Sequence, residues 1–225
     1  MNKLLAFVRL DFITVKPYLT FKNLLIYAAL AFFFTIITGF MSSGISIGMM
    51  VGVLFLSYPF VIGEKSNMDA LYSTLSINRK TVVLGRYLFA IAINCCTILF
   101  FLTFSIAGML VTRISSFESG SGEIIWTIFF LAVLVLVIQA LQLPLYFKLG
   151  YSKAKFVSMI PFAALPAGFF VISSFDNGAI TESLENLFTN VLNESSLIAL
   201  VVFALLLVLY GSYRLSLLFY KKREF

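Results

Sequence analysis

The chain has 225 residues, of which 61% are hydrophobic and 12% are charged, and its formal net charge is +6. Soluble domains carry about 25% charged residues, so this composition excludes a soluble protein and predicts an all-α integral membrane protein. The length predicts a single domain, and the positive charge needs no nucleic acid to explain it, because basic residues border the anionic inner leaflet of a membrane.

The first segment, residues 1–17, predicts a helix that lies in the membrane interface. Arg9 and Lys16 recur seven residues apart on one side of such a helix. Arg9 and Asp11 interrupt the apolar run, which argues against a secretory signal peptide. The apolar face of an interfacial helix sinks among acyl chains, and Pro17 is placed to end this one. We expect an anchor here, with a role in gating as the alternative.

Six later stretches are long and apolar enough to cross a bilayer as helices. Each comes close to the roughly 17–25 residues that about 30 Å of hydrocarbon requires. The predicted spans are residues 23–40, 44–62, 87–111, 124–147, 156–175 and 197–219.

Small and uncharged polar residues inside the spans predict how these helices pack. Gly44, Gly48 and Gly52 permit close helix approach, and we expect the neighbour to be another span of the same chain. The polar residues expected to make interhelical hydrogen bonds are Asn94, Gln139 and Gln142.

The distribution of charge predicts the orientation of the chain. All but one of the 16 basic residues lie on the side of the two termini, and the exception is Arg113. The positive-inside rule places that side in the cytoplasm. We therefore expect a multi-pass protein of the plasma membrane with both termini cytoplasmic, and the segment between spans two and three is cytoplasmic as well.

That segment, residues 63–86 with the sequence GEKSNMDALYSTLSINRKTVVLGR, predicts a short amphipathic helix. An apolar stripe with helical spacing consists of Met68, Leu71, Tyr72 and Leu75. Asn78 is placed to cap the helix that follows. The short helix cannot cross a bilayer, so it either rests on the membrane surface or presents its stripe to a groove on a soluble partner.

A second short amphipathic helix is predicted on the outer side before span six, within residues 176–196. Two interpretations remain open: a membrane-resting loop without a role in gating, or a lid over an exit path. The lid would be formed by Leu184, Leu187 and Val191.

Residues with catalytic or metal-binding chemistry are scarce. The sequence contains no histidine, its two cysteines are the adjacent pair Cys95 and Cys96, and its acidic residues cluster at the ends of the predicted spans. We therefore expect no metal and no cofactor on this chain. The predicted spans also lack the side chains that an intramembrane enzyme or a proton-coupled carrier would need.

The stretch GEKSNMDALYSTLSINRKTVVLGRYLFA resembles the signature of ABC-2-type permeases, the membrane subunits of two-component bacterial ABC exporters. In that family a coupling helix after span two is followed by the phrase leucine–proline–valine–serine/threonine–arginine and then by a small and a basic residue that open span three. The residues that match are Leu75, Ile77, Arg79, Gly85 and Arg86. Ser76 stands where proline is common, and Asn78 stands in place of serine or threonine. The topology of an interfacial helix, six spans and cytoplasmic ends also resembles the family.

The resemblance implies a permease that moves an apolar or amphipathic substrate outward, and we expect an amphipathic or antimicrobial peptide. ATP and Mg²⁺ would bind to a separate ABC ATPase, present in two copies, because the chain lacks a phosphate-binding G-x-x-x-x-G-K-[ST] loop. The second permease of the pair is expected to be a copy of this chain. The residues expected to contact the ATPase are Glu64, Met68, Leu71, Tyr72, Leu75 and Arg79. The alternative is a secondary carrier or an immunity-type membrane protein without an ATPase partner.

Overall fold

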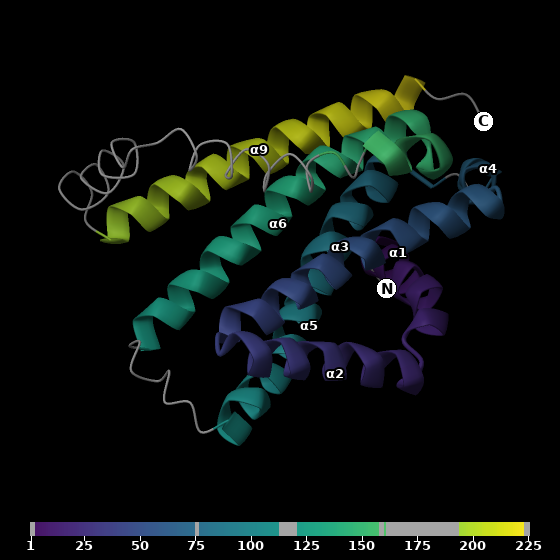
Figure 1. Ribbon diagram of the computed structural model, residues 1–225. Helices are drawn as coiled ribbons and strands as arrows, with labels where there is room; N and C mark the ends of the chain where they lie inside the picture. The colour runs from purple at the N-terminus through teal and green to yellow at the C-terminus, as the bar shows by residue number, and fades with distance from the viewer. Residues whose placement is uncertain (1–2, 75–76, 113–120, 158–159, 161–193, 223–225) are drawn as a thin grey trace.

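A computed structural model of the chain describes residues 3–74, 77–112, 121–157, 160 and 194–222. In chain order the helices with assigned bounds are α1 (Lys3–Val15), the 3-10 turn η1 (Lys16–Tyr18), α2 (Phe21–Thr38), α3 (Met41–Lys65), α4 (Met68–Thr74), α5 (Arg79–Thr112), α6 (Ser121–Leu149) and α9 (Glu194–Lys222). A further short helix covers residues 151–157. The long helices form an elongated bundle, and α4 lies at the same end as the last turn of α9 (Figure 1). The all-α prediction is confirmed for the described residues.

Among the described residues, five helices are long and apolar enough to cross a membrane: α2, α3, α5, α6 and α9. They coincide with five of the six predicted spans. The predicted span 156–175 falls almost entirely outside the described residues, so the count of six stays a prediction. The proposed lid residues Leu184, Leu187 and Val191 also lie outside the described residues.

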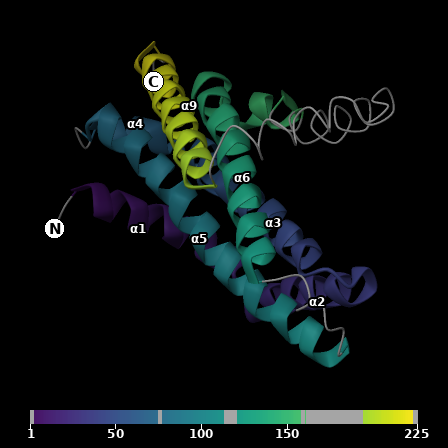
Figure 2. The same cartoon turned by 90° about the vertical axis from the view of Figure 1, so that its left-hand side faces the viewer.

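The first helix ends where predicted, because α1 stops at Val15 and Pro17 lies in the 3-10 turn that follows. Its buried face consists of Phe7, Asp11 and Val15, which recur every four residues. This face packs against α5 and α3. Figure 2 shows α1 lying beside α5 at the end of the bundle that carries α4. The arrangement buries an acidic side chain in the middle of an otherwise apolar contact.

Two glycines in the left-handed region end the helices that precede tight turns. Gly39 has φ 72° and donates its N–H to the Thr35 carbonyl at 2.9 Å, which closes α2 before α3 begins. Gly150 has φ 74° and caps α6 in the same way through the Tyr146 carbonyl. Residues with a Cβ adopt this conformation at a cost, so both turns depend on glycine.

The small-residue stripe of α3 packs inside the chain, as predicted. A Cβ at Gly48 would come within 2.6 Å of Phe101 Cβ, and one at Gly52 would lie 2.9 Å from the Thr97 hydroxyl. Both neighbours belong to α5, whose close approach makes α3 the most buried of the five apolar helices.

A reciprocal amide pair joins α5 to α6 within the bundle. Asn94 Nδ2 donates to Gln139 Oε1 at 2.7 Å, and Gln139 Nε2 donates to Asn94 Oδ1 at 2.9 Å. Both side chains are buried. The predicted interhelical hydrogen bond is therefore confirmed for these two residues.

This pair gives a testable expectation about stability. Asn94→Leu leaves the Gln139 amide without its partner, and we expect the free energy of unfolding to fall by about 1–2 kcal/mol. Asn94→Leu/Gln139→Leu removes both amides and should recover part of that loss. Unfolding in SDS of the two variants and the wild type measures the difference. A double variant less stable than the single one would contradict the expectation.

Candidate functional site

Helix α4 is held between α3 and α5 by short turns at both of its ends. Asn67 adopts φ 47° between α3 and α4, a left-handed conformation that asparagine tolerates better than most residues. After α4, Ile77 donates its N–H to the Tyr72 carbonyl at 3.0 Å. Asn78 Oδ1 then accepts the N–H of Lys80 at 3.0 Å, which confirms the predicted cap of α5. Helix α5 accordingly begins at Arg79, directly after the cap, and continues through the predicted span that starts at residue 87.

The predicted apolar stripe is divided between the interior of the chain and its surface. Tyr72 is 4% exposed, and its ring meets the ring of Phe7 edge-on at 5.3 Å between centroids. Met68 is half-buried and packs against the same core. Leu71 is 48% exposed, whereas Leu75 lies outside the described residues. Leu71 is therefore the large apolar side chain that α4, within its described part, presents to the outside.

The two polar residues of the predicted contact bind other parts of the same chain. The Glu64 carboxylate accepts the N–H of Ser152 at 3.0 Å, at the start of the helix over 151–157. Arg79 Nη1 donates to the Lys221 carbonyl at 2.6 Å and to the Tyr220 carbonyl at 3.4 Å, in the last turn of α9. A cation at a helix C-terminus and an anion at an N-terminus are both favourable placements. Glu64 and Arg79 thus join the segment around α4 to the ends of two neighbouring helices, and a contact with an ATPase stays a prediction for both.

A buried ion pair that was not predicted from the sequence lies at this end of the molecule. Arg86 Nη1 lies 2.8 Å from Asp11 Oδ1, and the two residues are 4% and 0% exposed. Arg86 Nη2 also donates to the Pro59 carbonyl at 3.3 Å, and the guanidinium lies 4.7 Å from the centre of the Phe60 ring. One side chain of α5 therefore contacts both α1 and α3. The sequence held one indication that Asp11 is buried: it lies midway between Phe7 and Val15 on the same face of α1.

Burial controls the protonation of this pair. It raises the pKa of the Asp11 carboxyl to about 6, and the positive charge of Arg86 lowers that pKa in part. At pH 7 the carboxylate is still ionised. A fall of about one pH unit is enough to protonate half of it.

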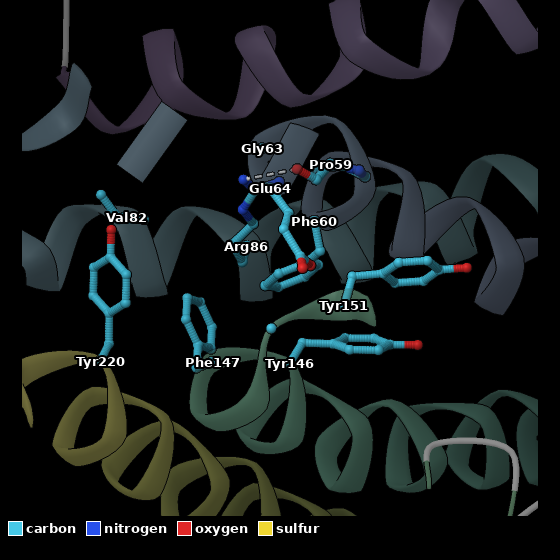
Figure 3. Close-up of a pocket in the computed structure, with 11 residues that line it drawn as sticks. Pro59, Phe60, Gly63, Glu64, Val82, Arg86, Tyr146, Phe147, Tyr151 and Tyr220 are labelled. Atoms are coloured by element: carbon cyan, nitrogen blue, oxygen red, sulfur yellow. Dashed lines mark hydrogen bonds between the residues drawn. The ribbon is translucent and has the colours of Figure 1, made fainter. Parts of the chain in front are cut away.

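A cavity of about 20 Å³ lies next to Arg86, with room for one water molecule. Figure 3 shows the hydrogen bond from Arg86 to Pro59 on one side and aromatic rings carried by α6 and α9 on the other. The lining residues are Pro59, Phe60, Gly63, Glu64, Val82, Arg86, Tyr146, Phe147, Gly150, Tyr151 and Tyr220. The cavity is far too small for a peptide. Within the described residues, no group of three His, Cys, Asp or Glu side chains could hold a metal ion.

The family model described as ABC-2 family transporter protein matches residues 7–221 of the chain. The chain belongs to the ABC-2 family of transporter proteins. Comparison with curated proteins and with solved structures gave no match. An ABC-2 permease is the transmembrane component of a transporter and is not itself catalytic. Membership implies an ABC ATPase partner in general, and together with the five apolar helices it fits a multi-pass protein of the plasma membrane.

The matched region includes the elements that meet around α4 in this ABC-2 permease. It begins at Phe7, on the buried face of α1, and ends in the last turn of α9, where Arg79 binds. The Asp11–Arg86 pair lies inside it as well. The α4 end of the bundle is therefore part of the region that identifies the family.

Proposed function

We propose that the chain is the permease subunit of a two-component ABC exporter and that α4 is its coupling helix. The observation that supports this most strongly is the construction of α4. It is a seven-residue helix between two membrane-spanning helices, held from inside through Tyr72, with Leu71 exposed. An exposed leucine on a fixed helix suits a hydrophobic groove on a soluble partner. A resting surface helix would instead turn its whole apolar stripe toward lipid.

The charge around α4 supports a cytoplasmic location for this end of the bundle. Lys65 and Lys80 flank α4 and are exposed, as are Lys221 and Lys222 at the end of α9. The positive-inside rule places such a cluster in the cytoplasm, where ATP is available. We propose that two ATPase subunits bind from this side, one to each copy of a permease homodimer.

The transported substrate is proposed to be an amphipathic peptide or another hydrophobic compound. The spans are rich in aliphatic and aromatic residues, whereas a charged solute would require compensating charges along its path. Leu184, Leu187 and Val191 are proposed to line an outer lid above that path. Saturable stimulation of ATP hydrolysis in the purified complex by a helical amphipathic peptide, with no response to a hydrophilic peptide of equal length, would test the substrate class.

The role of α4 is tested with Leu71→Glu in the tagged chain, purified from native membranes in mild detergent. We expect the wild type to carry an ABC ATPase. The variant should retain at least about tenfold less ATPase, because a charge replaces an apolar contact at the centre of the proposed interface. Quantitative mass spectrometry of the purified material gives the ratio of ATPase to permease.

The matched control is Leu5→Glu, which places the same charge at another exposed leucine, on α1 and 62% exposed. It should keep the wild-type ratio. If neither the wild type nor the control carries an ATPase, a secondary carrier or an immunity-type protein becomes the better explanation. Equal ATPase retention by Leu71→Glu and the wild type would remove α4 from the interface.

A further inference from the structure

Helix α4 is connected to the membrane-spanning helices through α1 as well as through its own two ends. The connection begins at Tyr72 of α4, whose ring packs edge-on against Phe7 of α1. Phe7 in turn lies directly over Gly85 of α5, where a Cβ would come within 2.5 Å of the Phe7 ring. Because a larger residue would displace that ring, glycine at this position lets α1 and α5 approach closely.

One turn further along α1, the buried ion pair adds α3 to this connection. Asp11 contacts Arg86, and the same guanidinium binds the Pro59 carbonyl and covers the Phe60 ring. A buried ion pair contributes little net stability, since removing both charges from water offsets their attraction. The ion pair instead fixes the position of α1 along α5, because sliding α1 by one turn would leave two buried charges unpaired.

We propose that Asp11 and Arg86 are positioning residues that make α1 a second mechanical connection between the coupling helix α4 and the ends of α3 and α5. When a bound ATPase displaces α4, Tyr72 carries Phe7 with it, and the ion pair passes the movement of α1 to Arg86 and Pro59. The origin of the movement rests on the proposed function. The connection itself is a property of the isolated chain and is tested there.

The ion pair also gives the docking of α1 a pH dependence of known sign. The pKa of Asp11 is about 6 when α1 is docked, whereas an aspartate released into water has a pKa of about 3.9. Between these values the docked state binds more protons, so lowering the pH strengthens docking. From pH 7.5 to pH 5.5 the docking equilibrium should shift about fourfold toward the docked state.

The groups packed around Asp11 support the assignment of this pH dependence to its carboxyl. Arg86 of α5 is the charged group that acts on it. From α3, the Phe60 ring and the Pro59 carbonyl contact the guanidinium of Arg86. From α4, Tyr72, which carries a phenol, contacts Phe7. Arg9 on α1 itself is exposed.

Hydrogen–deuterium exchange of the purified full chain, at pH 5.5 and pH 7.5 and corrected for intrinsic rates, measures the docking of α1 and α4 separately. In the wild type, α1 should be about fourfold more protected at the lower pH. Asp11→Lys places two positive charges together, so exchange should accelerate in α1 and, because Tyr72 loses its support, in α4 as well. Arg9→Gln, an exposed charge on the same helix, should behave as the wild type.

A second variant distinguishes the loss of the ion pair from general misfolding. Asp11→Leu/Arg86→Met keeps an apolar contact, so α1 should stay protected while the pH difference disappears. A wild type without a pH difference in α1, or an Asp11→Lys variant in which α1 loosens and α4 does not, would overturn the proposal. In a complex with the ATPase, nucleotide should alter exchange in α1 and α4 of both proteins, because the Tyr72–Phe7 contact is kept, whereas the response around Pro59 and Arg86 should be weaker in the double variant. A chain that purifies without an ATPase contradicts the proposed function and leaves the tests on the isolated chain decisive for the connection.

Discussion

Arg86→Met is expected to lower the free energy of unfolding by about 3–5 kcal/mol at pH 7.5. Methionine fills a similar volume, but it leaves the Asp11 carboxylate fully buried without its counterion. The loss of the Arg86 charge raises the pKa of Asp11 further, because that charge is what lowers it in the wild type. The difference from the wild type should therefore shrink as the pH falls and Asp11 becomes neutral. Unfolding in SDS at pH 5.5 and pH 7.5 measures both effects.

Two controls separate the buried pair from the general loss of an arginine. Arg9→Met removes an exposed arginine from α1 and should change stability by less than about 0.5 kcal/mol. Adding Asp11→Leu to Arg86→Met should recover most of the loss, because an apolar pair needs no counterion. An Arg86→Met variant that unfolds at the wild-type midpoint would show that the two charges do not meet in the folded chain.

Gly48→Leu is expected to be comparably damaging, with a loss of about 3 kcal/mol or a failure to fold. The added side chain would occupy the space of Phe101, whose Cβ already lies within 2.6 Å of where a Cβ at this position would stand. The matched control is Gly211→Leu in α9, where nothing lies within 4 Å of an added Cβ. That change should be neutral or slightly stabilising, since leucine favours a helix more than glycine does.

A compensating change tests the assigned neighbour of Gly48. In Gly48→Leu/Phe101→Ala the new leucine has room where the ring was, so part of the lost stability should return. Thermal unfolding of the four proteins in one detergent gives the interaction energy. If Phe101→Ala makes Gly48→Leu worse, the steric partner of Gly48 lies elsewhere, for example in a second copy of the chain.

Much of the fold could be predicted from the sequence, because burial in lipid imposes strong local requirements. Five of the predicted spans appear as helices, and the stop at Pro17 and the cap at Asn78 are local effects of single residues. The predicted span that starts at residue 87 lies inside α5, because hydropathy marks where a helix enters hydrocarbon. Backbone hydrogen bonds and the cap decide where the helix itself begins.

The candidate site was predictable only in part, because periodicity identifies the apolar face of a helix but not what covers it. The stripe of α4 was recognised, yet its Tyr72 is covered by Phe7 from α1. In the sequence, Asp11 was interpreted as an interruption of an apolar run. Arg86 was interpreted as the basic residue that opens a span. Their contact joins segments far apart in the sequence, and no local pattern signals such a contact.

The bond between Arg79 and the last turn of α9 has a consequence for the placement of labels. Because the Tyr220 and Lys221 carbonyls are held at the first turn of α5, anything fused behind α9 starts beside α4. A flexible glycine–serine linker of sixteen residues spans only about 20–25 Å on average, so a bulky tag on it would compete with a protein docking at Leu71. A small fluorophore at the same place would instead sit close to the arriving partner, and energy transfer to a labelled ATPase would report its binding directly.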